Sequence, residues 1–180
     1  KFTLFLMSLF LTVGAMAQYG SKMVYVTDLS QLSNDKVYTL ESERCYLMYN
    51  TTANATGISS SNSTLLNTNT RPAKSKDDVN QQFKIENING SYYLYSVGAK
   101  KFVNSDKSLI AGRGEAIELA DASSIGECRV RVNFKGYNNK YINLGGSNQM
   151  IIDSWGTIDA GNAVAFIEAI KTMNKNMNIP

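Results

Sequence analysis

Apolar and polar residues alternate along most of this chain, in short stretches of period two that are separated by turn residues. Alternation of this kind places every second side chain on one face of a β-strand, and the stretches are rich in β-branched and aromatic residues. About twelve short strands with turns between them indicate an all-β closed or sandwich architecture. The pattern predicts strands at residues 37–42, 45–49, 65–66, 82–88, 92–97, 101–104, 108–111, 116–120, 128–134, 140–143, 149–153 and 163–168.

The connections carry signals of their own. Asn89-Gly90 separates two predicted strands and is typical of a tight β-hairpin. Asp28 precedes a short segment that we expect to form one helical turn, with the Asp28 side chain as its cap. Residues 50–78 are small and polar, and they predict a long exposed loop that contains three Asn-x-Ser/Thr sequons.

The C-terminal segment fits two periodicities. Residues 163–168 fit a short strand. One stripe of a helix is the other possibility, formed by Ala163, Val164, Ile167, Ile170 and Met173. We favour a strand that runs through Glu168, with a frayed tail from Lys171. A helix capped by Asn162 is the alternative.

A repeat organises the predicted strands into three units. Residues 101–104 (Lys-Phe-Val-Asn) and 140–143 (Lys-Tyr-Ile-Asn) are near copies, and residues 45–48 are a weaker third copy. Each copy is followed by an apolar pair and then by an alternating strand. A single four-stranded unit cannot bury its apolar face alone, so the three units must assemble. Six strands could then close a barrel, and the remaining three pairs could cap it.

This organisation resembles the β-trefoil, a fold of three four-stranded units with pseudo-threefold symmetry, as in ricin-type lectin domains. More narrowly, residues 28–40 resemble the opening of trefoil-like modules in exported proteins of gut Bacteroidetes, and residues 159–168 resemble their closing strand. The Gln-x-Trp signature of ricin-type lectins is not reproduced, since the nearest match is Gln81-Gln82-Phe83. The resemblance implies an accessory or carbohydrate-binding module without enzymatic activity.

The N-terminus predicts export. Lys1, a short apolar run and an Ala-x-Ala ending at Ala17 are typical of a secretory signal peptide. We therefore expect a signal peptide at residues 1–17, a lead-in segment at 18–35, a β-trefoil domain at 36–170 and a tail at 171–180. The cleaved protein would be secreted, periplasmic or at the cell surface, with no membrane span.

Composition excludes several classes of function. The sequence contains no His, which excludes Ser-His-Asp and Cys-His catalysis and every metal site that requires imidazole. The 18 Lys and Arg residues barely exceed the 15 Asp and Glu residues, so there is no basic surface of the kind that nucleic acids require. We expect no metal site and no cofactor.

Cys45 and Cys128 are the two cysteines of the sequence. In an oxidising compartment they could form one disulfide that closes a long loop. Both also lie in strand-like patterns, so two separate buried thiols are the alternative.

The best candidate for a ligand site is in the third unit. Trp155 is the only Trp, and Gly156 beside it favours a loop. An exposed indole can stack on the apolar face of a pyranose, and carboxylates and amides can bind sugar hydroxyls. The candidate set is therefore Asp153, Trp155, Asp159 and Asn162. In the alternative interpretation, Trp155 plugs the barrel. The rival function on the same fold is a protein-interaction or inhibitor module, or a structural spacer beside a catalytic domain.

Overall fold

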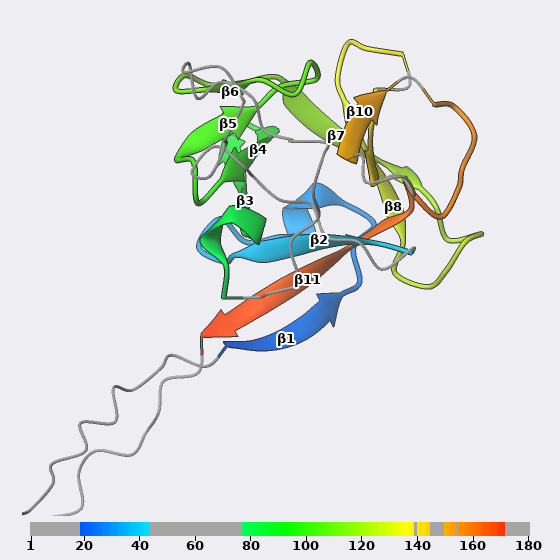
Figure 1. Cartoon of the computed structure of the whole chain (residues 1–180), viewed down its shortest axis with the longest axis horizontal. Coiled ribbons are helices and arrows are strands. Elements are labelled where there is room, and N and C mark those ends of the chain that lie inside the picture. Colours follow the sequence, from blue (N-terminus) through cyan, green and yellow to red (C-terminus); the bar gives the residue numbers. More distant parts are fainter. Residues whose placement is uncertain (1–18, 44–76, 139, 145–149, 154, 172–180) are drawn as a thin grey trace, which may run out of the picture.

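The structure is a computed structural model that describes residues 19–43, 77–138, 140–144, 150–153 and 155–171. The regular structure in these ranges is almost entirely β (Figure 1), as the alternating pattern predicts. The two helical elements are single 3₁₀ turns, η1 (Leu29–Gln31) and η2 (Val79–Gln81). The strands are β1 (Tyr19–Val24), β2 (Tyr38–Ser42), β3 (Phe83–Ile88), β4 (Ser91–Ser96), β5 (Lys101–Val103), β6 (Leu109–Ile110), β7 (Ala116–Asp121), β8 (Val130–Phe134), β9 (Tyr141–Leu144), β10 (Met150–Asp153) and β11 (Val164–Lys171).

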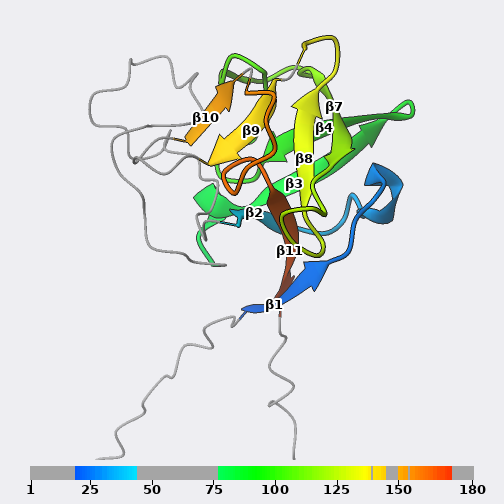
Figure 2. The same cartoon turned by 90° about the vertical axis from the view of Figure 1, so that its right-hand side faces the viewer.

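Six of these strands close into an antiparallel barrel. Going around the ring, β2 pairs with β3, β3 with β4, β4 with β7, and β7 with β8. The last strand closes the ring, because Val164 of β11 pairs with Ser42 of β2 on one side and with Val130 of β8 on the other. Figure 2 shows β11 passing beside both β2 and β8.

Short hairpins complete the units. β5 pairs with β6 between the barrel strands β4 and β7, and β9 pairs with β10 between β8 and β11. The corresponding strands of the first unit are predicted at residues 45–49 and 65–66, which lie outside the described residues together with most of the predicted loop at 50–78. The chain is a β-trefoil, as the resemblance implied.

Three matching hydrogen bonds express the pseudo-threefold symmetry. In each unit, the acceptor is the backbone carbonyl at the start of the last strand. The donor is the backbone N–H of the residue that follows the first strand of the next unit. The three donor–acceptor pairs are Val97 N to Gln82 O, Lys135 N to Ala116 O, and Glu43 N to Ala163 O. Gln82, Ala116 and Ala163 are therefore equivalent positions, which aligns the three units residue by residue.

Every barrel strand contributes at least one fully buried aliphatic or aromatic side chain to the core that fills the barrel. Burial of one such side chain contributes about 1.5–3 kcal/mol to folding. The hairpins add Val103, Leu109, Ile142 and Ile152, all buried. The barrel residues with no exposed surface include Leu40, Ile85, Leu94, Ile117, Val132 and Phe166.

The lead-in segment belongs to the folded unit. β1 pairs antiparallel along the outer part of β11, and Val26, Leu29 and Leu32 are buried in the core. The capped turn predicted after Asp28 is confirmed: the Asp28 carboxylate accepts the Ser30 N–H at 2.7 Å, and the Gln31 side chain accepts the Asp28 N–H. β1 itself lacks a regular alternating pattern, so the sequence did not indicate it.

The C-terminal alternatives are resolved in favour of the strand, since β11 runs from Val164 to Lys171. Its residues pair with β1, β2 and β8, and these backbone hydrogen bonds replace those that a helix would have made. The described residues include no helix whose length and apolar character would let it cross a bilayer.

Glu115 links the second unit to the third. Its two carboxylate oxygens accept the Ser105 N–H and the Tyr137 hydroxyl, each at 2.6 Å. Partial burial would raise the pKa of Glu115, but the hydrogen bonds from Tyr137 and Ser105 outweigh burial and hold this pKa below its ordinary value. The ionised carboxylate therefore holds the two units together.

Replacement of Phe166 by Ala should destabilise the fold. Its ring is fully buried and contacts Tyr38 edge to face, with ring centroids 6.1 Å apart. We expect the free energy of unfolding, measured with urea, to fall by about 3–5 kcal/mol. Met23→Ala, at a half-exposed apolar position in β1, should change it by less than about 0.5 kcal/mol. Equal effects of the two substitutions would contradict the assignment of the core.

Glu115 should make the free energy of unfolding depend on pH in the acid range. Because its pKa is lowered in the folded state, its contribution is complete above the ordinary value of 4.5 and is lost as the pH falls through the lowered pKa. The difference in unfolding free energy between the wild type and Glu115→Gln should therefore shrink on acidification. Tyr137→Phe should reduce that pH dependence. A difference that stays the same across the acid range would refute the linkage.

Candidate functional site

A row of polar and aromatic positions runs from β7, the last strand of the second unit, across three strands of the third unit. Glu118 of β7 is the register partner of Asn133 in β8, Asn133 is the partner of Tyr141 in β9, and Tyr141 is the partner of Asp153 in β10. The Asn133 amide nitrogen donates to Glu118 Oε1 at 2.8 Å. The row follows from strand alternation, because Val132 and Phe134, the neighbours of Asn133, are buried in the core.

Arg131 connects this face to the loop that carries Trp155. Its guanidinium lies over the Tyr141 ring, 4.3 Å from the ring centroid, and its Nη1 donates to the Gly156 carbonyl at 3.1 Å. Planar stacking and the fixed fork of the guanidinium hold the side chain in one orientation. Arg131 therefore fixes the backbone directly next to Trp155.

Trp155 lies on the surface. Its side chain is 51% exposed, so it does not plug the barrel as the alternative interpretation had it. It follows β10 in a segment without regular structure, consistent with the expected loop. An indole that is half in solvent and half against protein can present one face to a ligand while the other face rests on its support.

Asp159 and Asn162 form a closed turn behind this loop. Asp159 Oδ1 accepts the N–H groups of Gly161 and Asn162, at 2.7 and 3.1 Å. In return, the Asn162 amide oxygen accepts the Asp159 N–H, and its nitrogen donates to the Thr157 carbonyl at 2.8 Å. Asn162 has no exposed surface. Its side chain therefore stabilises the loop from inside and does not reach a surface ligand.

Of the four residues that the sequence suggested, the structure brings Asp159 and Asn162 into direct contact and leaves Trp155 on the surface. Asp153 ends β10 as the register partner of Tyr141, and its side chain lies outside the described part of the chain. The residue that sequence reasoning missed is Arg131. The sequence pattern could have indicated it, because Arg131 is a polar residue between the core residues Val130 and Val132. In a strand, such a side chain must point away from the core.

Buried polar atoms without a hydrogen-bond partner are concentrated in β8 and in β9, the strand that contains Tyr141. Among the described residues, three buried polar atoms have no hydrogen-bond partner: Arg131 Nε, Asn133 Oδ1 and Asn143 Oδ1. All three belong to β8 and β9. Most buried polar atoms in folded proteins are paired, so this concentration marks the outer face of the third unit as unusual within the fold.

The cysteines and acidic residues form no metal site in the described ranges. Cys128 is half-buried, and Cys45 lies outside the described residues, so their disulfide stays a prediction. Within the part of the chain that the structure describes, no group of three or more Cys, Asp or Glu side chains is arranged to hold an ion.

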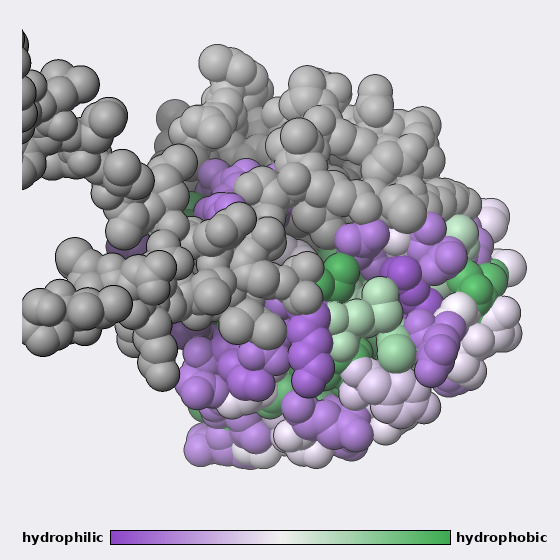
Figure 3. All heavy atoms as spheres, turned by 90° about the horizontal axis from the view of Figure 1, so that it is seen from below, coloured by the Kyte–Doolittle hydropathy of each residue, from purple (hydrophilic) through white to green (hydrophobic). Residues whose placement is uncertain are grey.

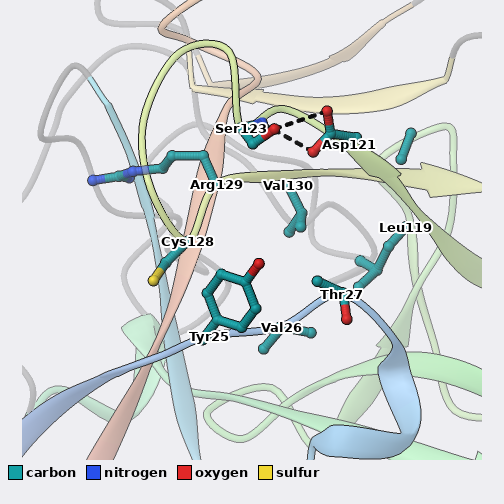
Figure 4. Close-up of a pocket in the computed structure, with 10 residues that line it drawn as sticks. Tyr25, Val26, Thr27, Leu119, Asp121, Ser123, Cys128, Arg129 and Val130 are labelled. Carbon is teal, nitrogen blue, oxygen red and sulfur yellow. Dashed lines mark hydrogen bonds between the residues drawn. The ribbon is translucent and has the colours of Figure 1, made fainter.

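A cavity of about 180 Å³ lies away from Trp155, where the lead-in segment meets the connection between β7 and β8 (Figure 4). The lead-in contributes Tyr25, Val26 and Thr27 to its wall, and β8 contributes Val130. This cavity could not be predicted from the pattern of residues, because its walls come from segments about a hundred residues apart.

The sequence matches no protein-family profile and no curated protein. Among solved structures, the chain is similar to a ricin B-like lectin of Macrolepiota procera, whose structure was solved in complex with lactose. The TM-score is 0.51 and the identity is 13%, over 76% of this chain and 96% of the lectin chain. At this identity the similarity establishes the β-trefoil fold and nothing finer.

Substitution of Asn162 should affect stability. Asn162→Ala leaves the Thr157 carbonyl and the Asp159 N–H without their partners, at a cost of about 1–3 kcal/mol in the free energy of unfolding. Asn34→Ala is the matched control, because Asn34 is exposed and accepts one long hydrogen bond from the Asn87 N–H. Urea unfolding of both variants measures the difference, and similar small effects would refute a structural role for Asn162.

Proposed function

We propose that the chain is a carbohydrate-binding module without enzymatic activity, and that its sugar site is on the outer face of the third unit. The observation that carries this proposal is Trp155, a half-exposed indole on a loop that Arg131 holds in place. Aromatic side chains at sugar sites work in this way, because a rigid ring loses little entropy when a pyranose stacks on it.

The groups around Trp155 have the chemistry that sugar hydroxyls need. Arg131 supplies N–H donors at the edge of the site, and it is already oriented by Tyr141 and the Gly156 carbonyl. Asp153, two residues before Trp155, is proposed as the carboxylate that accepts hydroxyl hydrogen bonds. Asp159 and Asn162 are positioning residues in this proposal, since they hold the loop from behind.

Two further considerations support the class of ligand. The structure of the similar lectin is a complex with lactose, so a β-trefoil of this size can carry a sugar site. The sequence has no His, which excludes a nucleophile activated by imidazole, and the groups named at the candidate site are ones that bind and orient. We therefore propose binding without turnover.

The location of the protein is part of the same proposal. The N-terminal pattern of residues 1–17 favours export to the periplasm, the cell surface or the medium, where glycans of other organisms are met. The trefoil would then serve as an accessory module that brings a glycan to an exported enzyme or to the cell surface.

The decisive experiment is a glycan array with the purified chain, followed by calorimetry on the best ligand. Trp155→Ala should weaken binding by about tenfold or more, because the stacking surface is lost. Its half-exposed position predicts little change in unfolding free energy, so lost binding would not reflect lost folding. Met23→Ala removes a similarly exposed apolar group in β1 and should bind like the wild type.

Two results would refute this function. One is a folded protein that binds no glycan on the array. The other is glycan affinity that Trp155→Ala leaves unchanged. Capture of a specific protein by the same sample would favour the rival interaction or inhibitor module.

A further inference from the structure

The cavity beside the lead-in segment is a second feature of the surface that the sugar site does not use. On the face seen from below, apolar residues lie among hydrophilic ones (Figure 3). The lining of the cavity is likewise mixed, with apolar residues beside Thr27, Asp121, Ser123 and Arg129. Its walls include Val26 and Val130, which are 2% and 5% exposed, and Leu119 of β7. Tyr25 stands at the mouth with 62% of its side chain exposed.

The cavity lies at the end of the barrel opposite the β5–β6 hairpin. β4 runs toward that hairpin, and β7 runs back from it to Asp121, where the connection to β8 begins. The lead-in segment crosses this end and buries Val26 against the core. The site therefore depends on the lead-in packing against the trefoil.

Asp121 is the one carboxylate among the residues that line this cavity. Asp121 and Arg129 are the charged residues that line it. The Arg129 guanidinium is neutralised elsewhere: its Nε lies 3.0 Å from Glu43 Oε2, and its Nη1 donates to the Glu41 carbonyl at 2.7 Å. Figure 4 shows the Arg129 side chain running away from Tyr25, Leu119 and Val130. Arg131, the next cation along β8, lies over the Tyr141 ring, and its charge also attracts the Asp121 carboxylate.

Asp121 is held as an ionised group in a fixed turn. Its two oxygens accept the N–H and the hydroxyl of Ser123, at 3.1 and 3.0 Å. These two hydrogen bonds, with a smaller contribution from the charge of Arg131, hold the pKa of Asp121 below its ordinary value. Each carboxylate oxygen keeps a further lone pair for another donor.

Size limits what can enter. At about 180 Å³, the cavity is smaller than the roughly 300–1,000 Å³ of sites that enclose a drug-sized ligand. It can hold one short apolar group. An aromatic ring at the mouth and a carboxylate at the rim then favour a cation at the end of that group.

We propose that this cavity binds a primary ammonium group on a short aliphatic stem, with the stem against Val26, Leu119 and Val130 and the ammonium between Asp121 and Tyr25. A free alkylamine and a lysine side chain of a partner protein share this chemistry. An alkanoate of the same length is excluded, because it would bring a second negative charge to Asp121.

Titration of the full chain with n-butylammonium, followed by NMR, tests the site. We expect saturable shifts of the Val130 and Leu119 methyl signals and of the Tyr25 ring, and no such shifts with butyrate. Nα-acetyl-lysine N-methylamide distinguishes the sources: saturable binding of this compound means that a lysine side chain can enter, whereas binding of butylammonium alone restricts the site to free amines.

Two variants and a matched control make the test specific. Asp121→Asn keeps an acceptor for the Ser123 N–H but removes the charge, and it should weaken butylammonium binding about tenfold. Tyr25→Leu should weaken it severalfold while it keeps an apolar group at the mouth. Asp106→Asn is the control, because Asp106 accepts the Ser108 N–H in the same Asp-x-Ser arrangement away from the cavity, and it should bind like the wild type.

The proposal fails if butylammonium gives no saturable shifts, if butyrate binds equally well, or if Asp121→Asn binds like the wild type. It also fails if the shifts are confined to Gly90 and Tyr92, which line the neighbouring cavity on the other side of Thr27. Because neither Trp155 nor Arg131 lines the cavity, these outcomes are independent of the glycan experiment.

Discussion

Closure of the barrel by β11 is the constraint on which the rest of the structure depends. Val164 pairs with β2 and β8 at once, and the outer part of the same strand pairs with β1. An open six-stranded sheet would leave two edges exposed and one apolar face in water. Because the chain closes the ring with its last strand, the inward side chains of all three units are buried together. The lead-in segment also pairs with β11, and this pairing positions Tyr25 at the cavity.

The fold could be predicted from the sequence because it depends on period-two patterns and on their repetition. The copies at residues 101–104 and 140–143 lie at β5 and β9, the apolar pairs that follow them lie in β6 and β10, and the last strands of these units are β7 and β11. The helical alternative for residues 163–173 shows where the pattern is insufficient, since Ala163, Val164 and Ile167 satisfy both periods. Pairing with three other strands decided between them, and that is information about distant residues. β1 was missed for the same reason, because it is a strand through its pairing with β11.

The candidate site was predicted less completely, because a side chain's chemistry does not reveal its orientation. Asn162 has the residue type and spacing of a sugar ligand, yet its amide is used within its own turn. Trp155 could equally have been a core residue, and only its 51% exposure decides the question. Arg131 was overlooked because stacking on Tyr141 joins residues of two strands, and no spacing within one segment encodes that contact.

The equivalent turns of the three units show how a symmetric scaffold acquires different local functions. The backbone alignment makes Gln81, Glu115 and Asn162 equivalent, each one or two residues before the last strand of its unit. The Gln81 side chain donates to Asp78 Oδ2 within its own turn, whereas Glu115 accepts from Ser105 and from Tyr137 of the next unit. Asn162 supports the loop of Trp155. The inward positions of the strands must stay apolar in every unit, because the three units share one core. The turns carry no such restriction, and it is in the turn of the third unit that the chain places its only Trp.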